Sequence, residues 1–245
     1  MAKERLDKAL SSLGCGSRRQ VGDLIRAGRV TVNGQTVRDP SVRVTPAEDV
    51  LALGGAELRW RIGRYYMLNK PPDLVSARVD NLHPTVLSVF PENERRGLFP
   101  VGRLDKTTEG LLLLTDDGGF CHALMAPRRH VEKVYLARVS GRLDLSAPKR
   151  FAEGLTLADG TRCRPAKLTL LGQEDGLTCI EVVLREGKHH QVKRMVAAVG
   201  GHVEHLKRVA VGPLRLDESL APGEYRELTP QEVAALRQAA QAGPA

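Results

Sequence analysis

Paired cysteines are missing from this chain of 245 residues. The four cysteines are scattered, and no two of them form a Cys-x-x-Cys pair; they are Cys15, Cys121, Cys163 and Cys179. This spacing argues against a zinc ribbon and against a disulfide framework. It fits a reducing compartment, so we expect the protein in the cytoplasm.

Long hydrophobic runs are also absent. No apolar stretch approaches the roughly 20 residues of a membrane-spanning helix, and residues 1–5 lack the apolar region of a signal peptide. We therefore expect no membrane attachment.

Acidic residues are too few to balance the basic ones. The sequence has 37 Lys and Arg against 29 Asp and Glu, which gives a formal net charge of +8. Such a charge suits a polyanionic partner, either RNA or an acidic membrane surface. The length allows two domains with a substantial core.

The first sixty residues have the signals of a small helical domain. Apolar residues recur at helical spacing over residues 6–13, and Gly14 ends that pattern. Ser17 and Gln20 form a capping box for a second helix. Alternating residues on both sides of Asn33-Gly34 predict a β-hairpin with a tight turn.

Basic residues cluster before this hairpin, and we expect six of them to contact RNA: Lys3, Arg5, Arg18, Arg19, Arg26 and Arg29. The Ser-Arg-Arg and Arg-Val-x-Val-Asn-Gly elements within residues 3–50 resemble the small RNA-binding domain named after ribosomal protein S4. The resemblance implies a module that binds backbone phosphates and so positions the second domain on the RNA.

The remaining sequence is mostly strand-like, and we place the linker near residues 58–63. We expect domains over residues 1–60 and 61–237, followed by a flexible tail over 238–245. Turns are predicted at residues 69–72, 116–118 and 159–160. Helices are predicted over residues 191–199 and from a capping box at residues 229–232. The sequence therefore predicts an α+β fold.

One acidic residue, Asp105, lies beside an arginine just before a strand that is apolar enough to be buried. A carboxylate in such a place is costly unless it is paired or used. The surrounding run, Val101-Gly102-Arg103-Leu104-Asp105-Lys106-Thr107-Thr108-Glu109-Gly110 and the leucines after it, resembles the catalytic motif of RNA pseudouridine synthases of the branch that acts on ribosomal RNA. For the second domain, this implies a mixed, mainly antiparallel sheet with flanking helices.

The resemblance implies an essential role for Asp105 in converting uridine to pseudouridine. Whether its carboxylate attacks the sugar, attacks the base or removes a proton stays open. Arg103 would fill the gap that the flipped base leaves in the RNA. In an extended segment its side chain projects on the same side as that of Asp105.

Two later residues match further family motifs. Tyr135 corresponds to the tyrosine that packs on the target uracil. Lys193 corresponds to the basic residue that forms an ion pair with the catalytic aspartate, which would lower the pKa of that carboxyl group. Many relatives have arginine there, and lysine lacks its bidentate geometry.

Neighbours of Lys193 complete the expected site. We expect His190, Gln191 and Arg194 to contact RNA. The run from His202 to His205 invites a metal interpretation, but no cysteine pair and no His-Glu-x-x-His helix accompanies it. We therefore expect neither a metal nor a cofactor. A sugar-cleaving carboxylate pair of Asp105 and Glu109 is an alternative without further support.

Three further stretches, residues 66–71, 83–87 and 221–226, resemble the branch of this family that modifies small-subunit ribosomal RNA. The resemblance therefore implies a cofactor-independent isomerase acting on one uridine of 16S ribosomal RNA. Two alternatives stay open: a synthase acting on 23S ribosomal RNA, and a non-catalytic RNA-binding protein of ribosome assembly. The expected partner is ribosomal RNA or a small-subunit assembly intermediate, and we expect a monomer.

Overall fold

The computed structural model describes residues 3–45, 48–58, 63–126 and 129–241. The chain forms two compact units, Met1–Arg64 and Tyr65–Ala245. The boundary lies four residues beyond the expected one. Residues 59–62 of the predicted linker lie outside the described residues.

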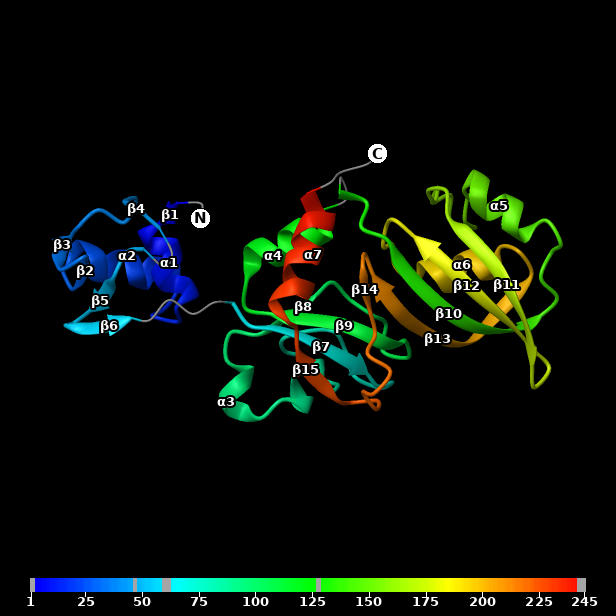
Figure 1. The fold of residues 1–245 in the computed structure, drawn as a ribbon. Helices are drawn as coiled ribbons and strands as arrows, with labels where there is room; N and C mark the ends of the chain where they lie inside the picture. The colour runs from blue at the N-terminus through cyan, green and yellow to red at the C-terminus, as the bar shows by residue number, and fades with distance from the viewer. Residues whose placement is uncertain (1–2, 46–47, 59–62, 127–128, 242–245) are drawn as a thin grey trace. The chain divides into compact units, whose positions relative to one another are not determined.

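Two helices and short strands form the first unit (Figure 1). Its elements are β1 (Glu4–Arg5), α1 (Leu6–Ser12), α2 (Arg18–Arg26), β2 (Val30–Val32), β3 (Gln35–Val37), β4 (Arg43–Val44), β5 (Leu51–Leu53) and β6 (Ala56–Leu58). Strand β1 pairs with β4, and the other strands form a sheet in the order β3-β2-β5-β6.

The local predictions for this unit are confirmed. Ser17 and Gln20 cap α2 reciprocally, each side chain accepting a hydrogen bond from the other residue's backbone N–H. Asn33 and Gly34 have φ angles of 52° and 79°, which a two-residue hairpin turn of this kind requires. The region from residue 39 to residue 61 carries no usable sequence signal, and it supplies β4, β5 and β6.

The second unit contains a nine-stranded mixed sheet, as expected. The main strand order is β11-β12-β10-β13-β9-β7-β15, with β14 on β13 and β8 on β9. The strands are β7 (Tyr65–Lys70), β8 (Phe99–Val101), β9 (Glu109–Thr115), β10 (Lys133–Gly141), β11 (Lys167–Glu174), β12 (Leu177–Leu184), β13 (Gly201–Val211), β14 (Leu214–Arg215) and β15 (Tyr225–Glu227). The helices are η1 (Val86–Val89), α3 (Glu92–Arg95), α4 (Gly118–Met125), α5 (Ala147–Glu153), α6 (Gln191–Ala197) and α7 (Pro230–Gln241).

Apolar side chains pack on both faces of this sheet. One core joins η1, α5 and α6 to alternate residues of the strands, among them Leu112 and Leu114. The other joins α4 and α7, which pack side by side (Figure 1), to Leu111 and Leu113. Burial on both faces explains why β9 is a continuous apolar run rather than an alternating one.

The two halves of the sheet meet at a short parallel contact. Strands β9 and β13 pair only at Glu109 with Lys207 and at Gly110 with Arg208. A Cβ on Gly110 would lie 2.3 Å from the backbone oxygen of Arg208, and its φ is +96°. Glycine is therefore required at this point, next to the loop that carries Asp105.

Four helices of this unit were not predicted, namely η1, α3, α4 and α5. Asp117, expected in a hairpin turn, instead caps α4 by accepting a hydrogen bond from the Phe120 backbone N–H at 3.0 Å. The apolar side chains of α4 give little helical periodicity, because this short helix begins with two glycines. Helices η1 and α3 span four residues each, too short for a periodic pattern. Helix α5 buries only Ala147 and Phe151, so its apolar pattern is weak.

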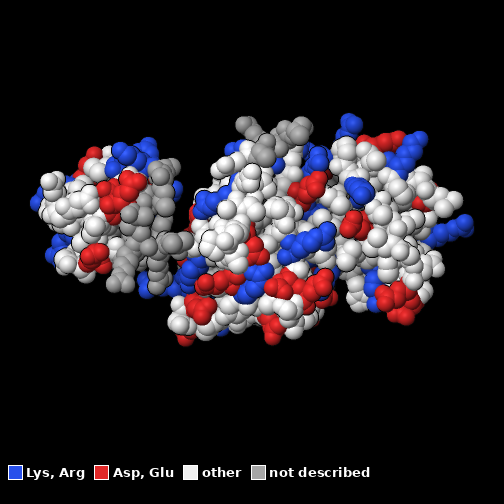
Figure 2. Space-filling model, viewed as in Figure 1, with Lys and Arg blue, Asp and Glu red and all other residues white. Residues whose placement is uncertain are grey.

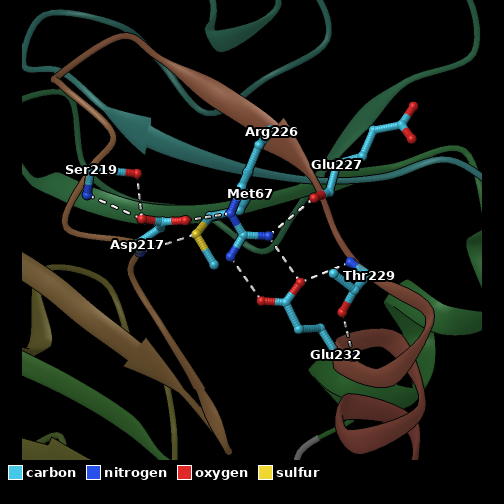
Figure 3. Close-up of polar contacts among 7 residues, drawn as sticks. All are labelled: Met67, Asp217, Ser219, Arg226, Glu227, Thr229 and Glu232. Carbon is cyan, nitrogen blue, oxygen red and sulfur yellow. Dashed lines mark hydrogen bonds and ion pairs between the residues drawn. The ribbon is translucent and has the colours of Figure 1, made fainter.

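A cluster of charged residues fixes the C-terminal helix. Figure 3 shows the Arg226 guanidinium between the carboxylates of Asp217 and Glu232, at 2.6 and 2.8 Å. Thr229 and Glu232 form the predicted capping box. The helix continues to Gln241 with Ala240 buried, so the expected tail is wrong for residues 238–241; residues 242–245 lie outside the described residues.

No helix in the described parts of the chain is long and apolar enough to cross a membrane.

Candidate active site

The loop between β8 and β9 carries Asp105, and buried side chains from a neighbouring segment hold it. Ser76 is buried, and its hydroxyl oxygen accepts a hydrogen bond from the Leu104 backbone N–H at 3.0 Å. The same hydroxyl donates to the Leu104 carbonyl oxygen at 2.9 Å. The backbone of the residue before Asp105 is therefore held on both sides by one side chain.

Lys70 holds the other side of the loop. Its side chain is fully buried at the end of β7, and Nζ donates to three carbonyl oxygens: Pro71 at 2.9 Å, Lys106 at 3.1 Å and Thr108 at 2.9 Å. Burial lowers the pKa of Lys70 to about 8, against the opposing effect of nearby carboxylates. The Thr108 backbone N–H also donates to the Asp105 carbonyl oxygen at 3.0 Å, which closes a turn.

Asp105 is presented at the surface of this fixed loop. Leu104 is buried in the core, while Arg103 is exposed and the Asp105 side chain is 28% exposed. Among the described residues, the basic side chain that contacts the Asp105 carboxylate is His190, whose Nε2 lies 3.6 Å from Oδ1. The aspartate is thus neither buried without a partner nor freely solvated.

The position of Lys193 differs from the expected contact. Its Nζ donates to the Thr107 hydroxyl at 2.7 Å, and no ion pair with Asp105 is formed among the described residues. Helix α6 does bring Lys193 to the loop of Asp105, because Thr107 lies two residues after the aspartate in that loop. The expected neighbourhood is present, and the direct contact belongs to His190.

Tyr135 lies in the same part of the sheet. In register it is opposite Arg208 of β13, and Arg208 is opposite Gly110 of β9. Tyr135 is therefore two strands away from Gly110, which begins the buried part of β9 after the loop of Asp105. Tyr135 is 8% exposed and its hydroxyl has no hydrogen-bond partner within the described residues.

The three residues expected to contact RNA near Lys193 have different surroundings. His190 is exposed. Arg194 is ion-paired with Asp159 at 2.5 Å. Gln191 does not fit the expectation, because it is only 4% exposed and its amide holds the preceding loop: Oε1 accepts from the Lys188 backbone N–H at 2.9 Å, and Nε2 donates to Glu186 at 2.6 Å.

Several basic residues of the first unit already have acidic partners. Arg5 and Arg18 both bind the Asp7 carboxylate, at 3.1 and 2.8 Å, and lower the pKa of Asp7 to about 2. Arg26 pairs with Asp23 at 3.0 Å. On the face drawn in Figure 2, acidic side chains lie between the basic ones over each unit.

The remaining expected RNA contacts of this unit are unpaired within the described residues. Lys3, Arg19 and Arg29 are all solvent-accessible, and none of them forms an ion pair there. These three are the best placed of the six to meet phosphate groups.

Sequence reasoning did not find Ser76 and Lys70 as residues of the site. Nothing near Ser76 in the sequence signals a partner 28 residues away. The sequence pattern places Lys70 in a turn with the two prolines after it. A lysine at the end of a largely apolar strand is the available signal, because a buried lysine needs acceptors for its ammonium group.

Comparisons with known proteins agree on one family. The model of RNA pseudouridylate synthases matches residues 64–198, and the model of the S4 domain matches residues 4–51. An uncharacterized RNA pseudouridine synthase of Bacillus subtilis (strain 168) is 40% identical over 230 residues, covering 94% of this chain and 96% of that protein.

Two further relatives extend this agreement. The ribosomal small subunit pseudouridine synthase A of Escherichia coli (strain K12) is 40% identical over 233 residues, covering 95% of this chain and 99% of that protein. The structure described as a crystal structure of pseudouridylate synthase is 38% identical with a TM-score of 0.68, covering 95% of this chain and 99% of that one.

Proposed function

This chain belongs to the RNA pseudouridylate synthase family, so it is an isomerase acting on RNA, and we propose that its substrate is one uridine of small-subunit ribosomal RNA. The relative from Escherichia coli is named for the ribosomal small subunit and matches this chain over nearly its full length. That likeness supports 16S over 23S ribosomal RNA as the substrate.

The reaction needs no other reactant. The bond between the sugar carbon C1′ and the base nitrogen N1 breaks, the uracil turns, and C1′ joins the ring carbon C5. The proton on C5 is lost and N1 gains one, so no atom is added or removed overall. A carboxylate that acts on the sugar or the base is the chemical group that the chain must supply.

We assign that role to Asp105. The observation that supports it is the fixation of its loop by Ser76 and Lys70, while the carboxylate stays partly exposed. A catalytic group is useful only when it is held close to its productive geometry, and buried contacts to backbone atoms provide this. A protein that only binds RNA has no need for a rigidly held carboxylate facing a polyanion.

The other expected residues have supporting roles in this proposal. Tyr135 offers its ring to the uracil, and Arg103 occupies the place of the flipped base in the RNA. Lys193 keeps the loop in position through Thr107 and supplies positive charge near Asp105. The first unit binds phosphate groups of the same RNA.

The test compares Asp105→Asn with Glu109→Gln, a matched change of the neighbouring carboxylate. We expect Asp105→Asn to abolish pseudouridine formation with RNA affinity nearly unchanged, and Glu109→Gln to retain activity. Wild-type activity of Asp105→Asn would overturn the catalytic assignment. Loss of activity in both variants would favour a pair of carboxylates instead.

The substrate is tested separately in cells. Pseudouridines are mapped in both ribosomal RNAs from cells with and without this protein. We expect one uridine of the small-subunit RNA to lose its modification when the protein is absent. A lost site in the large-subunit RNA would support the 23S alternative, and no lost site in either RNA would support a non-catalytic role in ribosome assembly.

A further inference from the structure

Two histidines at the start of α6 form an exposed aromatic surface beside Asp105. The rings of His189 and His190 are stacked, with centroids 3.8 Å apart and planes inclined by 22°. Neither residue is buried. The Nε2 atom of His190 is 3.6 Å from the Asp105 carboxylate, so the stack borders the place where the reaction is proposed to occur.

The backbone that carries this stack is rigidly held. The buried Gln191 side chain bonds to the Lys188 backbone N–H on one side and to Glu186 on the other. The carboxylate of Glu186 also accepts the Arg164 backbone N–H at 2.9 Å. His190 has a φ of 49°, a left-handed conformation that non-glycine residues seldom adopt. Such a conformation persists only where the surrounding structure imposes it, and it is common at functional sites.

The ring of His189 has few contacts within the protein. Within the described residues its side chain makes no hydrogen bond and no ion pair, and its one ring contact there is the stack with His190. A metal site does not explain the pair, since no group of three metal-binding side chains occurs in the described parts of the chain. Core packing does not explain it either, because neither residue is buried.

We propose that the His189–His190 stack is a binding surface for the base of a nucleotide that flanks the target uridine. Proteins recognise single-stranded RNA by stacking splayed bases on aromatic side chains, histidine included. Neighbouring nucleotides are joined by a single phosphodiester linkage, so a nucleotide that flanks the target stays close to it. A surface that starts 3.6 Å from Asp105 is therefore within reach of the neighbouring nucleotide when the target lies against the aspartate.

This surface adds affinity for a flanking nucleotide, which Asp105 and Tyr135 do not provide. Those two residues act on the target nucleotide itself, whereas the histidines engage its neighbour. Arg103 occupies the gap that the extruded uridine leaves in the strand. The histidine stack instead binds a flanking base that is itself splayed out of the strand, and so holds the strand open.

The test measures RNA affinity with enzyme that carries Asp105→Asn, so that the RNA is bound but not converted. The probe is a fragment of small-subunit ribosomal RNA that the wild-type enzyme converts, made intact or with an abasic ribose on the 5′ or the 3′ side of the target. His189 is replaced by Ala or by Phe. His202→Ala serves as the control, because it removes another exposed imidazole of the same unit.

We expect His189→Ala to weaken binding of the intact RNA on the order of 10-fold, as loss of one base stack does. The same substitution should cost less than about twofold on one of the two abasic RNAs, since the stacked base is already missing there. His189→Phe should restore affinity, because a phenyl ring stacks without charge or hydrogen bonds. His202→Ala should bind like the parent enzyme.

Three results would overturn the inference. These are unchanged affinity of His189→Ala, an equal loss on intact and both abasic RNAs, and a loss in His189→Phe as large as in His189→Ala. The last result would indicate a contact of the imidazole with phosphate instead. Because the inference rests on the proposed function, the probe must first be converted by wild-type enzyme. An enzyme that converts no fragment contradicts the proposed function and not the stacking surface.

Discussion

Ser76→Ala is the sharpest test of how the fold holds the catalytic loop. The substitution removes one oxygen atom and nothing else, so it creates almost no cavity. It deletes both hydrogen bonds to the Leu104 backbone, at 2.9 and 3.0 Å, and leaves buried N–H and C=O groups without their partner. At about 1 kcal/mol for each bond, we expect a loss of about 2 kcal/mol in the free energy of unfolding. For a unit of this size that lowers Tm by about 4 to 8 °C.

The effect on activity should exceed the effect on binding. Release of Leu104 loosens Asp105, and a displacement of about 1 Å can reduce a rate by about 100-fold. We expect kcat for pseudouridine formation to fall by about 10- to 100-fold, while KM for RNA changes less than about twofold. Ser88→Ala, at an exposed serine, is the control and should behave like wild type. A Ser76→Ala variant with wild-type kcat and Tm would refute the argument that Ser76 positions the loop.

Three further predictions concern charge and backbone geometry. Arg19→Ala should reduce the slope of log affinity for RNA against log salt concentration by about one released counterion. Arg26→Ala should reduce that slope less, because Arg26 is already paired with Asp23, and equal slopes for the two variants would contradict this. Burial, aided by a neighbouring guanidinium, lowers the pKa of Lys133 to about 8 against 10.5 in the unfolded chain. Between pH 8 and 10.5 the free energy of unfolding of the wild type, measured in urea, should therefore rise by about 3 kcal/mol relative to that of Lys133→Met. A difference between the two proteins that does not change with pH would refute this prediction. Gly110→Ala should destabilise by more than about 3 kcal/mol, because its Cβ would lie 2.3 Å from a backbone oxygen, whereas Gly118→Ala, in open space, should be neutral.

Features that depend on neighbouring residues were predictable from the sequence. The capping boxes at Ser17 and Thr229 and the Asn33-Gly34 turn are local chemistry, and all three occur as expected. Helix α6 was predictable from apolar residues on one face. Asp117 shows the limit, because an acidic residue before glycine caps a helix or makes a turn with the same local chemistry.

Features that depend on distant residues were not predictable. Lys70 meets the loop of Asp105 across 36 and 38 residues, and no local pattern encodes such a distance. The contact of His190 with Asp105 is of the same kind, because it joins two segments that are distant in the sequence. Motif resemblance predicted which segments meet, and the side-chain contacts needed the folded chain.

The pairing of β15 with β7 has a consequence for how the catalytic unit is made. The first strand of this unit receives its edge partner from a segment near the end of the chain, and Asn69 bonds to Leu220 across 151 residues. At a synthesis rate of about 5 to 20 residues per second, β7 waits roughly 8 to 30 s on the ribosome for that partner. During this time its edge can pair with a strand of another nascent chain. A chain that ends before residue 225 should therefore aggregate rather than fold into a partly active product.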